Sequence, residues 1–151
     1  MIERATEGDL PEILRLQRLA FKEESDCIGD PNIHPMIQTL EDLKHDFVKE
    51  TFLKYVEGGR ILGSVRAFEE EGTCHIKRMV VHPDFWGKGI GKSLMREIER
   101  VFGNAERYEL FTRIDHKRTR PFYQSLGYQP FRTEKVSDTL TFVYLEKRNS
   151  G

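Results

Sequence analysis

The sequence lacks long apolar runs, has few cysteines and carries almost no excess charge of either sign. No stretch approaches the roughly 20 apolar residues that a membrane-spanning helix needs, so no membrane association is expected. The two cysteines, Cys27 and Cys74, form no CxxC pair, which predicts free thiols in a reducing compartment. The formal net charge is −1, so nucleic acid would meet no broad basic field, and no nucleic-acid partner is expected.

Further absences narrow the class of protein. The five histidines show no metal-ligand spacing, so no metal site is predicted. The first residues lack a basic segment followed by an apolar run, so no signal peptide is expected, and we expect a cytoplasmic protein. No repeat, linker or low-complexity segment divides the 151 residues, which predicts a single domain over residues 1–151.

Hydrophobic periodicity predicts a mixed α/β domain with the element order β-α-α-β-β-β-α-β-α-β-β. Apolar positions with helical spacing begin at Leu10, whereas residues 23–38 show little periodicity and predict a loop. A second helix is expected over residues 40–48. Strands are expected over residues 51–57, 61–68, 74–81, 108–114 and 139–147, with helices after residue 89 and over residues 118–126.

One segment, DFWGKGIGKSLM at residues 84–95, has the composition of a phosphate-binding loop. A Walker A loop requires glycine five residues before Gly91, and Trp86 occupies that position. A dinucleotide fingerprint that begins at Gly87 and Gly89 requires a third glycine where Lys92 stands. Neither nucleotide motif is therefore matched.

The loop could still bind an anion, although it matches neither nucleotide motif. Unpaired backbone N–H groups at a helix start lie at the positive end of the helix dipole. Glycines at 87, 89 and 91 would let a pyrophosphate approach the backbone closely, and Lys88 and Lys92 add positive charge. A glycine-rich helix entry without a ligand is the alternative interpretation.

Two segments resemble the GNAT superfamily of N-acetyltransferases. VVHPDFWGKGIGKSLM is similar to that family's acetyl-CoA pyrophosphate loop, with Gly89 and Gly91 at its two small positions and Trp86 where Gln or Arg is usual. RPFYQSLGYQPF is similar to the family's Tyr-x-x-x-Gly-Phe/Tyr segment, with Tyr123 and Gly127 in register. The resemblance is closest over residues 73–131.

The resemblance implies a mixed, mostly antiparallel sheet of six to seven strands, flanked by about four helices, with a bulged central strand. The spacing of Ile76, Met79 and Val81 is independently consistent with a β-bulge, although an irregular buried strand fits equally. The implied cofactor is acetyl-CoA. The residues that the resemblance assigns to its binding are Met79, Val80, Val81, Trp86, Gly87, Lys88, Gly89, Gly91, Lys92, His116 and Tyr123.

The resemblance also implies catalytic roles. Tyr123 occupies the position of the tyrosine that protonates the CoA sulfur in family members. His75 stands where many relatives carry a glutamate, and a histidine can act as a base near neutral pH. An ordered water relay is the alternative base. His116 replaces an asparagine that is common in relatives, and the neighbouring Lys117, Arg118 and Arg120 suit either the CoA 3′-phosphate or a basic surface turn.

The implied activity is acetyl-CoA-dependent N-acetylation of a small-molecule or peptide amine, by direct attack through a tetrahedral intermediate. Glu23, Glu24, Asp26 and Asp30 make the expected acceptor-side loop acidic, which suits either a cationic amine or plain solvation. A non-catalytic acyl-CoA sensor of the same fold is the alternative, and a nucleotide-binding protein is a third hypothesis. Both a monomer and a homodimer remain open.

Overall fold

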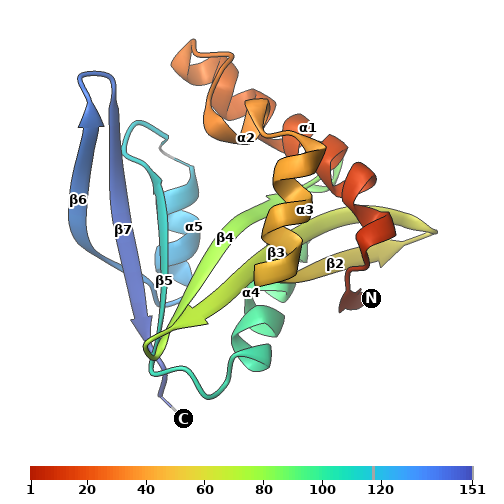
Figure 1. Ribbon diagram of the computed structural model, residues 1–151. Helices are drawn as coiled ribbons and strands as arrows, with labels where there is room; N and C mark the ends of the chain where they lie inside the picture. Colours follow the sequence, from red (N-terminus) through yellow and green to blue (C-terminus); the bar gives the residue numbers. More distant parts are fainter. Residues whose placement is uncertain (117, 151) are drawn as a thin grey trace.

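The computed structural model describes residues 1–116 and 118–150, which form a seven-stranded sheet with helices on both faces (Figure 1). The strands are β1 (Ile2–Arg4), β2 (Thr51–Glu57), β3 (Arg60–Glu70), β4 (Thr73–Val81), β5 (Arg107–Arg113), β6 (Gln129–Ser137) and β7 (Leu140–Arg148). The α-helices are α1 (Leu10–Ile28), α2 (His34–Ile37), α3 (Leu40–Lys49), α4 (Ile90–Val101) and α5 (Thr119–Ser125). The expected mixed α/β fold is confirmed.

The sheet has the strand order β1-β2-β3-β4-β5-β7-β6, and its neighbouring strands are antiparallel except for β4 and β5. These two strands run parallel and are paired only where Thr73–His75 meets Arg107–Glu109. In Figure 1 they lie together near the bottom of the view and diverge toward the top. The sheet is therefore continuous at one end and open at the other.

A β-bulge in β4 begins where this opening develops. Ser64 of β3 pairs with Val80, whereas Arg66 pairs with Lys77, so β4 has more residues than β3 between these two pairs. Arg78 adopts a φ of 53°, in the left-handed region that side chains other than glycine rarely occupy. The bulge that the family resemblance implied is present. It lies just beyond the last residue of β4 that pairs with β5, so it bends β4 where the two strands separate.

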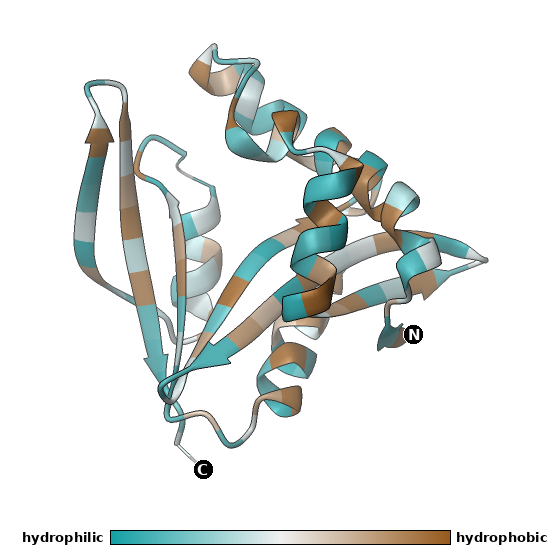
Figure 2. Cartoon of the chain, viewed as in Figure 1, coloured by the Kyte–Doolittle hydropathy of each residue, from teal (hydrophilic) through white to brown (hydrophobic). Residues whose placement is uncertain are grey.

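The helices bury two hydrophobic clusters against the sheet. Helices α1 and α3 cover one face, and their apolar residues pack with Phe52, Ile61 and Val80. Helix α4 packs on the opposite face through a buried row that includes Leu94 and Ile98. Figure 2 shows the resulting brown segments on the covered central strands, whereas β6 is exposed along its length. No helix within the described residues is long and apolar enough to cross a membrane.

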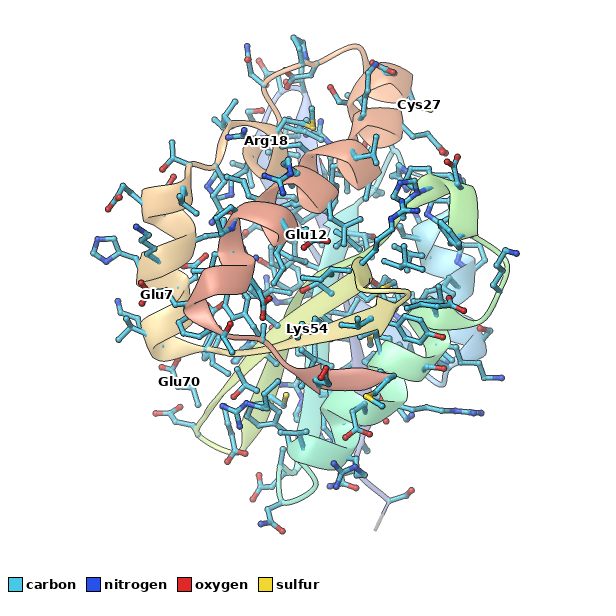
Figure 3. The ribbon with its side chains drawn as sticks, turned by 90° about the vertical axis from the view of Figure 1, so that its right-hand side faces the viewer. Glu7, Glu12, Arg18, Cys27, Lys54 and Glu70 are labelled. Carbon is cyan, nitrogen blue, oxygen red and sulfur yellow. The ribbon has the colours of Figure 1, made fainter. Side chains whose placement is uncertain are left out.

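The expectation of a loop over residues 23–38 was wrong in two places. Helix α1 continues to Ile28 and ends at Gly29, whose φ of 79° is the left-handed conformation typical of a helix C-terminus. The added short helix α2 begins with His34 and Pro35 and brings the number of α-helices in the described chain to five. Figure 3 shows α1 in front of the strands, with Glu12, Arg18 and Cys27 along it.

The extension of α1 follows from burial that sequence periodicity did not show. Glu24 and Ser25 face inward and are 8% and 4% exposed, although both are polar. The Ser25 hydroxyl donates a hydrogen bond to the carbonyl of Asp30, 2.6 Å away, which folds the chain back after the helix. At Ser25, a hydrogen bond thus satisfies an inward-facing polar side chain where an apolar contact would be expected.

A buried arginine attaches the helices of one face to the sheet. Arg66 of β3 is 2% exposed and lies 3.2 Å from Asp46 and 3.4 Å from Glu50. Its guanidinium also donates hydrogen bonds to the side-chain oxygens of Gln17 and Gln38, at 3.2 and 3.1 Å. A charged group so far from water requires these partners, so the arginine determines where α1 and α3 can lie on β3.

We predict that Arg66→Met lowers the free energy of unfolding by about 3–5 kcal/mol, because the buried carboxylate of Glu50 and the half-buried one of Asp46 would lose their shared cation. Urea unfolding followed by circular dichroism measures this change. Arg15→Met is the matched control, since Arg15 is exposed on α1. Equal effects of the two substitutions would contradict an anchoring role for Arg66.

Candidate functional site

Two adjoining cavities lie on either side of the open end of β4. The first, here called the loop cavity, has a volume of about 300 Å³ and is bounded by the glycine loop, α1 and α5. The second, the strand cavity, has a volume of about 400 Å³ and is bounded by α1, α2, β4, β5 and β7. Both are lined by the same five residues at their junction: Phe21, Glu24, Met79, Thr119 and Tyr123.

The glycine loop forms a cradle of backbone donors at the mouth of the loop cavity. Gly87 and Gly89 have φ values of 79° and 83°, and a Cβ atom on either would meet nothing within 4 Å. Gly89 is the N-cap of α4, whose first intrahelical bond runs from Ser93 N to Gly89 O. The preceding N–H groups of the first turn have no helical acceptor and face a region that suits an anion.

Gly91 serves a different purpose from the two preceding glycines. A Cβ atom there would lie 3.3 Å from both Met79 Cε and Phe122 Cζ. The small residue therefore lets α4 approach β4 and α5 closely at the cavity wall. Lys92 also lines the loop cavity, whereas Lys88 is outside its lining and lies 5.9 Å from the Phe85 ring centroid.

Trp86, the residue that departs from the family pattern, lies across the loop cavity. Its indole N–H donates a hydrogen bond to the carbonyl of Val81, 2.8 Å away. The guanidinium of Arg118 lies 4.0 Å from the Trp86 ring centroid, and the same arginine forms an ion pair with Glu23 of α1. A chain of contacts thus connects β4, the glycine loop, the segment before α5 and α1. Lys117, the neighbour of Arg118, lies outside the described residues.

Tyr123 is buried at the junction of the two cavities, with 7% of its surface exposed. Its position on α5 follows from the bond between Tyr128 N and Tyr123 O, which closes the turn after the helix. No hydrogen bond joins its hydroxyl to another described residue. Burial, with a smaller contribution from Glu24, raises the pKa of this hydroxyl, so it remains a proton donor at physiological pH.

Glu24 of α1 faces Tyr123 across the same junction. Burial raises the pKa of its carboxyl to about 7, and Arg113 and Arg78 only partly oppose this effect. A carboxyl group of this kind can accept a proton near neutral pH, unlike an exposed glutamate. The helical spacing Gln17, Phe21, Glu24 is the signal in the sequence that could have placed Glu24 on the inner face of α1.

His116 lies beside this carboxyl in the loop cavity. Its Nδ1 is 4.0 Å from Glu24 Oε1 and is buried without a hydrogen-bond partner among the described residues. Burial lowers the pKa of the imidazole, so the neutral ring is favoured. The structure therefore brings together Glu24, His116 and Tyr123, from three separate elements.

The structure places His75 away from this junction. Its ring stacks on Phe68 at a centroid distance of 4.9 Å, and its Nδ1 lies 3.6 Å from Glu109 Oε2. It lines neither cavity, because it belongs to the part of β4 that is still paired with β5. The geometry thus offers His75 no contact with the groups at the junction.

The side chains that line the strand cavity were not predicted from the sequence as site residues, except for Met79 and Tyr123. Arg78 and Lys77 come from the bulged strand, Arg113 comes from β5, and Glu24 is the acidic side chain among its described lining residues. Two other carboxylates of the predicted acidic loop are already paired, Asp26 with Lys22 one helical turn away and Glu23 with the distant Arg118. The side chains that line the strand cavity come from segments distant in sequence, so spacing along the chain could not reveal them.

No group of three or more histidine, cysteine, aspartate or glutamate side chains in the described part of the chain is arranged to hold a metal ion. The site is instead built from backbone donors, a buried tyrosine and a buried carboxyl group. These are elements of acid–base and anion-binding chemistry.

Comparison with solved structures shows the same fold in several acetyltransferases. The PaiA N-acetyltransferase from Thermoplasma acidophilum, in complex with coenzyme A, superposes with a TM-score of 0.84 at 19% identity, covering 98% of each chain. The ribosomal-protein-S18-alanine N-acetyltransferase from Escherichia coli has a TM-score of 0.81 at 12% identity, covering 100% of this chain and 94% of that chain.

Sequence comparison extends this likeness. UPF0157 protein YqkA from Bacillus subtilis (strain 168) is 29% identical over 129 residues, which cover 85% of this chain and 37% of YqkA. The chain thus spans little more than a third of that relative. Residues 11–128 match the acetyltransferase (GNAT) family, a range that includes the glycine loop and Tyr123. With its site geometry and its fold in agreement with this match, the chain belongs to the acetyltransferase (GNAT) family.

Proposed function

We propose that the protein transfers the acetyl group of acetyl-CoA to a primary amine of a small molecule or peptide. The observation that supports this proposal most strongly is that Tyr123 lines both cavities at their junction. A transfer reaction needs two substrates that reach one point from different sides, and the open end of β4 provides that arrangement.

The loop cavity suits the donor. The N–H groups of the first turn of α4 would hold the pyrophosphate, with the open space in front of Gly87 and Gly89 allowing close approach. Lys92 and Arg118 line the same cavity and supply positive charge. The unpaired edge of β4 near Met79 and Val80 would hold the pantetheine arm. Acetyl-CoA, when bound, supplies an activated acetyl thioester.

The junction residues suit the proton transfers that accompany amide formation. As the amine nitrogen bonds to the acetyl carbon and the carbon–sulfur bond breaks, one proton must leave the amine and one must reach the sulfur. Glu24 accepts the first proton, and Tyr123 donates the second. The pKa of Glu24, raised to about 7 by burial, suits a base, and the raised pKa of Tyr123 keeps its hydroxyl protonated and available as a donor.

The role proposed for Glu24 replaces the one expected for His75. Glu24 lines both cavities, whereas His75 lines neither. The neutral imidazole of His116, 4.0 Å from Glu24, would orient this carboxyl group or relay protons to it. In this proposal Glu24, His116 and Tyr123 act from the positions that they already occupy in the structure.

We predict that Tyr123→Phe lowers kcat by about 10²-fold or more while the Kd for acetyl-CoA stays within about twofold, since only the donated proton is removed. Release of CoA thiol in the presence of an amine panel measures turnover, and calorimetry measures Kd. Tyr55→Phe on β2 is the matched control. Unchanged turnover in Tyr123→Phe would exclude the tyrosine from the chemical step.

The same assay separates the alternative functions. Tight binding of acetyl-CoA without thiol release in the presence of any amine would indicate a non-catalytic acyl-CoA sensor. Displacement of acetyl-CoA by ATP would instead favour a nucleotide-binding protein that uses Gly91, Lys92 and Ser93.

We predict that Glu24→Gln has opposite effects on activity and stability. In the wild type, kcat/KM should rise with pH through about 7, the value to which burial raises the pKa of Glu24, and the substitution should abolish this rise. The raised pKa also means that ionised Glu24 destabilises the fold, an effect that grows as pH rises from 4.5 to about 7.

Glu24→Gln should therefore raise Tm by about 2 °C or more near pH 8 and have little effect well below pH 4.5, where Glu24 is protonated in both the folded and the unfolded chain. Differential scanning calorimetry measures both values. A lower Tm near pH 8 would contradict the burial of an uncompensated carboxylate, and an unchanged pH–rate profile would contradict its role as base.

A further inference from the structure

The strand cavity contains a guanidinium without an anionic partner. Arg78 lies at the bulge of β4, and its polar contact among the described residues is with Nδ1 of His34. Its Nε is buried without a hydrogen-bond partner, and no described carboxylate lies within ion-pair distance. Burial, followed by the positive charge of Arg78, lowers the pKa of His34, so this contact involves a neutral ring.

The other charged groups around Arg78 are already engaged. Lys77 Nζ lies 2.8 Å from Glu50, and Asp46 and Glu50 both interact with Arg66. On the opposite wall, Arg113 is 9% exposed and contacts Asp115 only at 3.4 Å. Arg78 is half-buried, its Nε is buried without a partner, and Asp46, Glu24 and Glu50 act on it only from beyond ion-pair distance. A poorly solvated cation is costly without a close anion, so Arg78 is positioned to receive one from a ligand.

The remaining groups in the strand cavity describe the rest of that ligand. Glu24 lies at the junction with the loop cavity. Arg113 and Arg78 are close enough for their positive charges to lower the pKa of its carboxyl. Two hydroxyls in the lining, Thr112 Oγ1 and Thr119 Oγ1, are buried without partners among the described residues. The apolar part of the wall consists of Ile33, Ile76, Leu110, Phe111, Leu140 and Phe142.

We propose that the acceptor is an amine that also carries a carboxylate, such as an α-amino acid with an apolar side chain, with Arg78 binding the carboxylate and Glu24 facing the amine. This inference rests on the proposed acetyltransferase function and specifies its acceptor. A guanidinium binds a carboxylate through two parallel hydrogen bonds, which fixes the orientation of the amine on the same molecule. In Figure 1, α1 and α2 lie on one side of this region and β5 and β7 on the other.

The charges of the strand cavity also argue against an acceptor that carries only positive charge. Three cations line the strand cavity together with one carboxyl group, counted over its described lining residues. A polyamine would place further positive charge beside Arg78 and Arg113 in a poorly solvated space. A zwitterionic acceptor instead pairs each of its charges with an opposite one. The volume of about 400 Å³ is within the usual range for small-molecule sites.

The test compares four acceptors in the CoA-release assay: L-leucine, L-leucinamide, 3-methylbutylamine and spermidine. Leucinamide keeps the shape of leucine but lacks the carboxylate, and 3-methylbutylamine keeps only the amine and side chain. We predict that kcat/KM for leucine exceeds that for each of the other three by about 10-fold or more, as expected for a charge-assisted pair. L-Phenylalanine and phenethylamine repeat the comparison with an aromatic side chain.

Variants connect this preference to Arg78. Arg78→Met should raise KM for the preferred amino acid by about 10- to 100-fold and leave KM for acetyl-CoA and turnover of the decarboxylated amine nearly unchanged. Arg78→Lys should keep part of the preference because it keeps the charge. Arg15→Met is the control, because Arg15 is exposed on α1 and lines neither cavity. Circular dichroism checks that each variant is folded.

The outcomes distinguish this inference from the proposed function. Acetylation of leucinamide, 3-methylbutylamine or spermidine at least as fast as leucine and phenylalanine would overturn the inference and leave the acetyltransferase function intact. A preference for the carboxylated amines that survives in Arg78→Met would also overturn the assignment to Arg78. Absence of thiol release with every amine, in folded protein that binds acetyl-CoA, would count against the proposed function itself.

Discussion

The separation of β4 from β5 is the constraint on which the rest of the site depends. Two strands that pair only over Thr73–His75 and Arg107–Glu109 leave backbone groups and side chains of the remaining β4 free to face ligands. The bulge at Arg78 produces this separation by adding one residue to β4 without a counterpart in β3. The same distortion places Met79 between the two cavities and Arg78 in the strand cavity. The strained backbone at Arg78 thus lies in the wall of the strand cavity, as is common at functional sites.

An opening in a sheet destabilises the fold unless other contacts hold its sides together. Here the helices of one face are held by the Arg66 network, and α4 is held against the other face by a continuous apolar row. The first of these contacts also determines where the far end of α1 lies, and therefore where Glu24 lies. Helix α1 therefore connects the Arg66 network, which stabilises the centre of the sheet, with Glu24 at the junction of the two cavities. The buried carboxyl group at its end is then maintained at a cost in stability, as is common at functional sites.

The local parts of this arrangement could be predicted from the sequence. Glycine spacing and the strand before it predicted a phosphate-binding helix entry, and the structure shows left-handed glycines and open space at Gly87 and Gly89. The irregular spacing of Ile76, Met79 and Val81 was compatible with the bulge that is present. These features depend on backbone conformation over a few residues, and the positions of glycines and apolar residues in the local sequence indicate that conformation.

The parts that depend on distant contacts could not be predicted. Glu24 was assigned to a loop because polar residues interrupt the apolar period of α1, although hydrogen bonds continue the helix. Arg78 of β4 and Arg113 of β5 line the same cavity, and no spacing along the chain shows that they do. His75 matched a family position, but its register with β5 places it outside both cavities. Residue type along the chain therefore did not indicate which side chains line the two cavities.

The most direct test of the two-sided site is a crystal structure of the protein with bound coenzyme A. The arrangement predicts the pyrophosphate at the N-terminus of α4, the pantetheine arm along β4 near Met79 and Val80, and the sulfur within about 3.5 Å of the Tyr123 hydroxyl. It also predicts that the strand cavity stays open beside the sulfur. Coenzyme A bound elsewhere, or with its sulfur directed away from Tyr123, would contradict the assignment of the junction as the place where the two substrates meet.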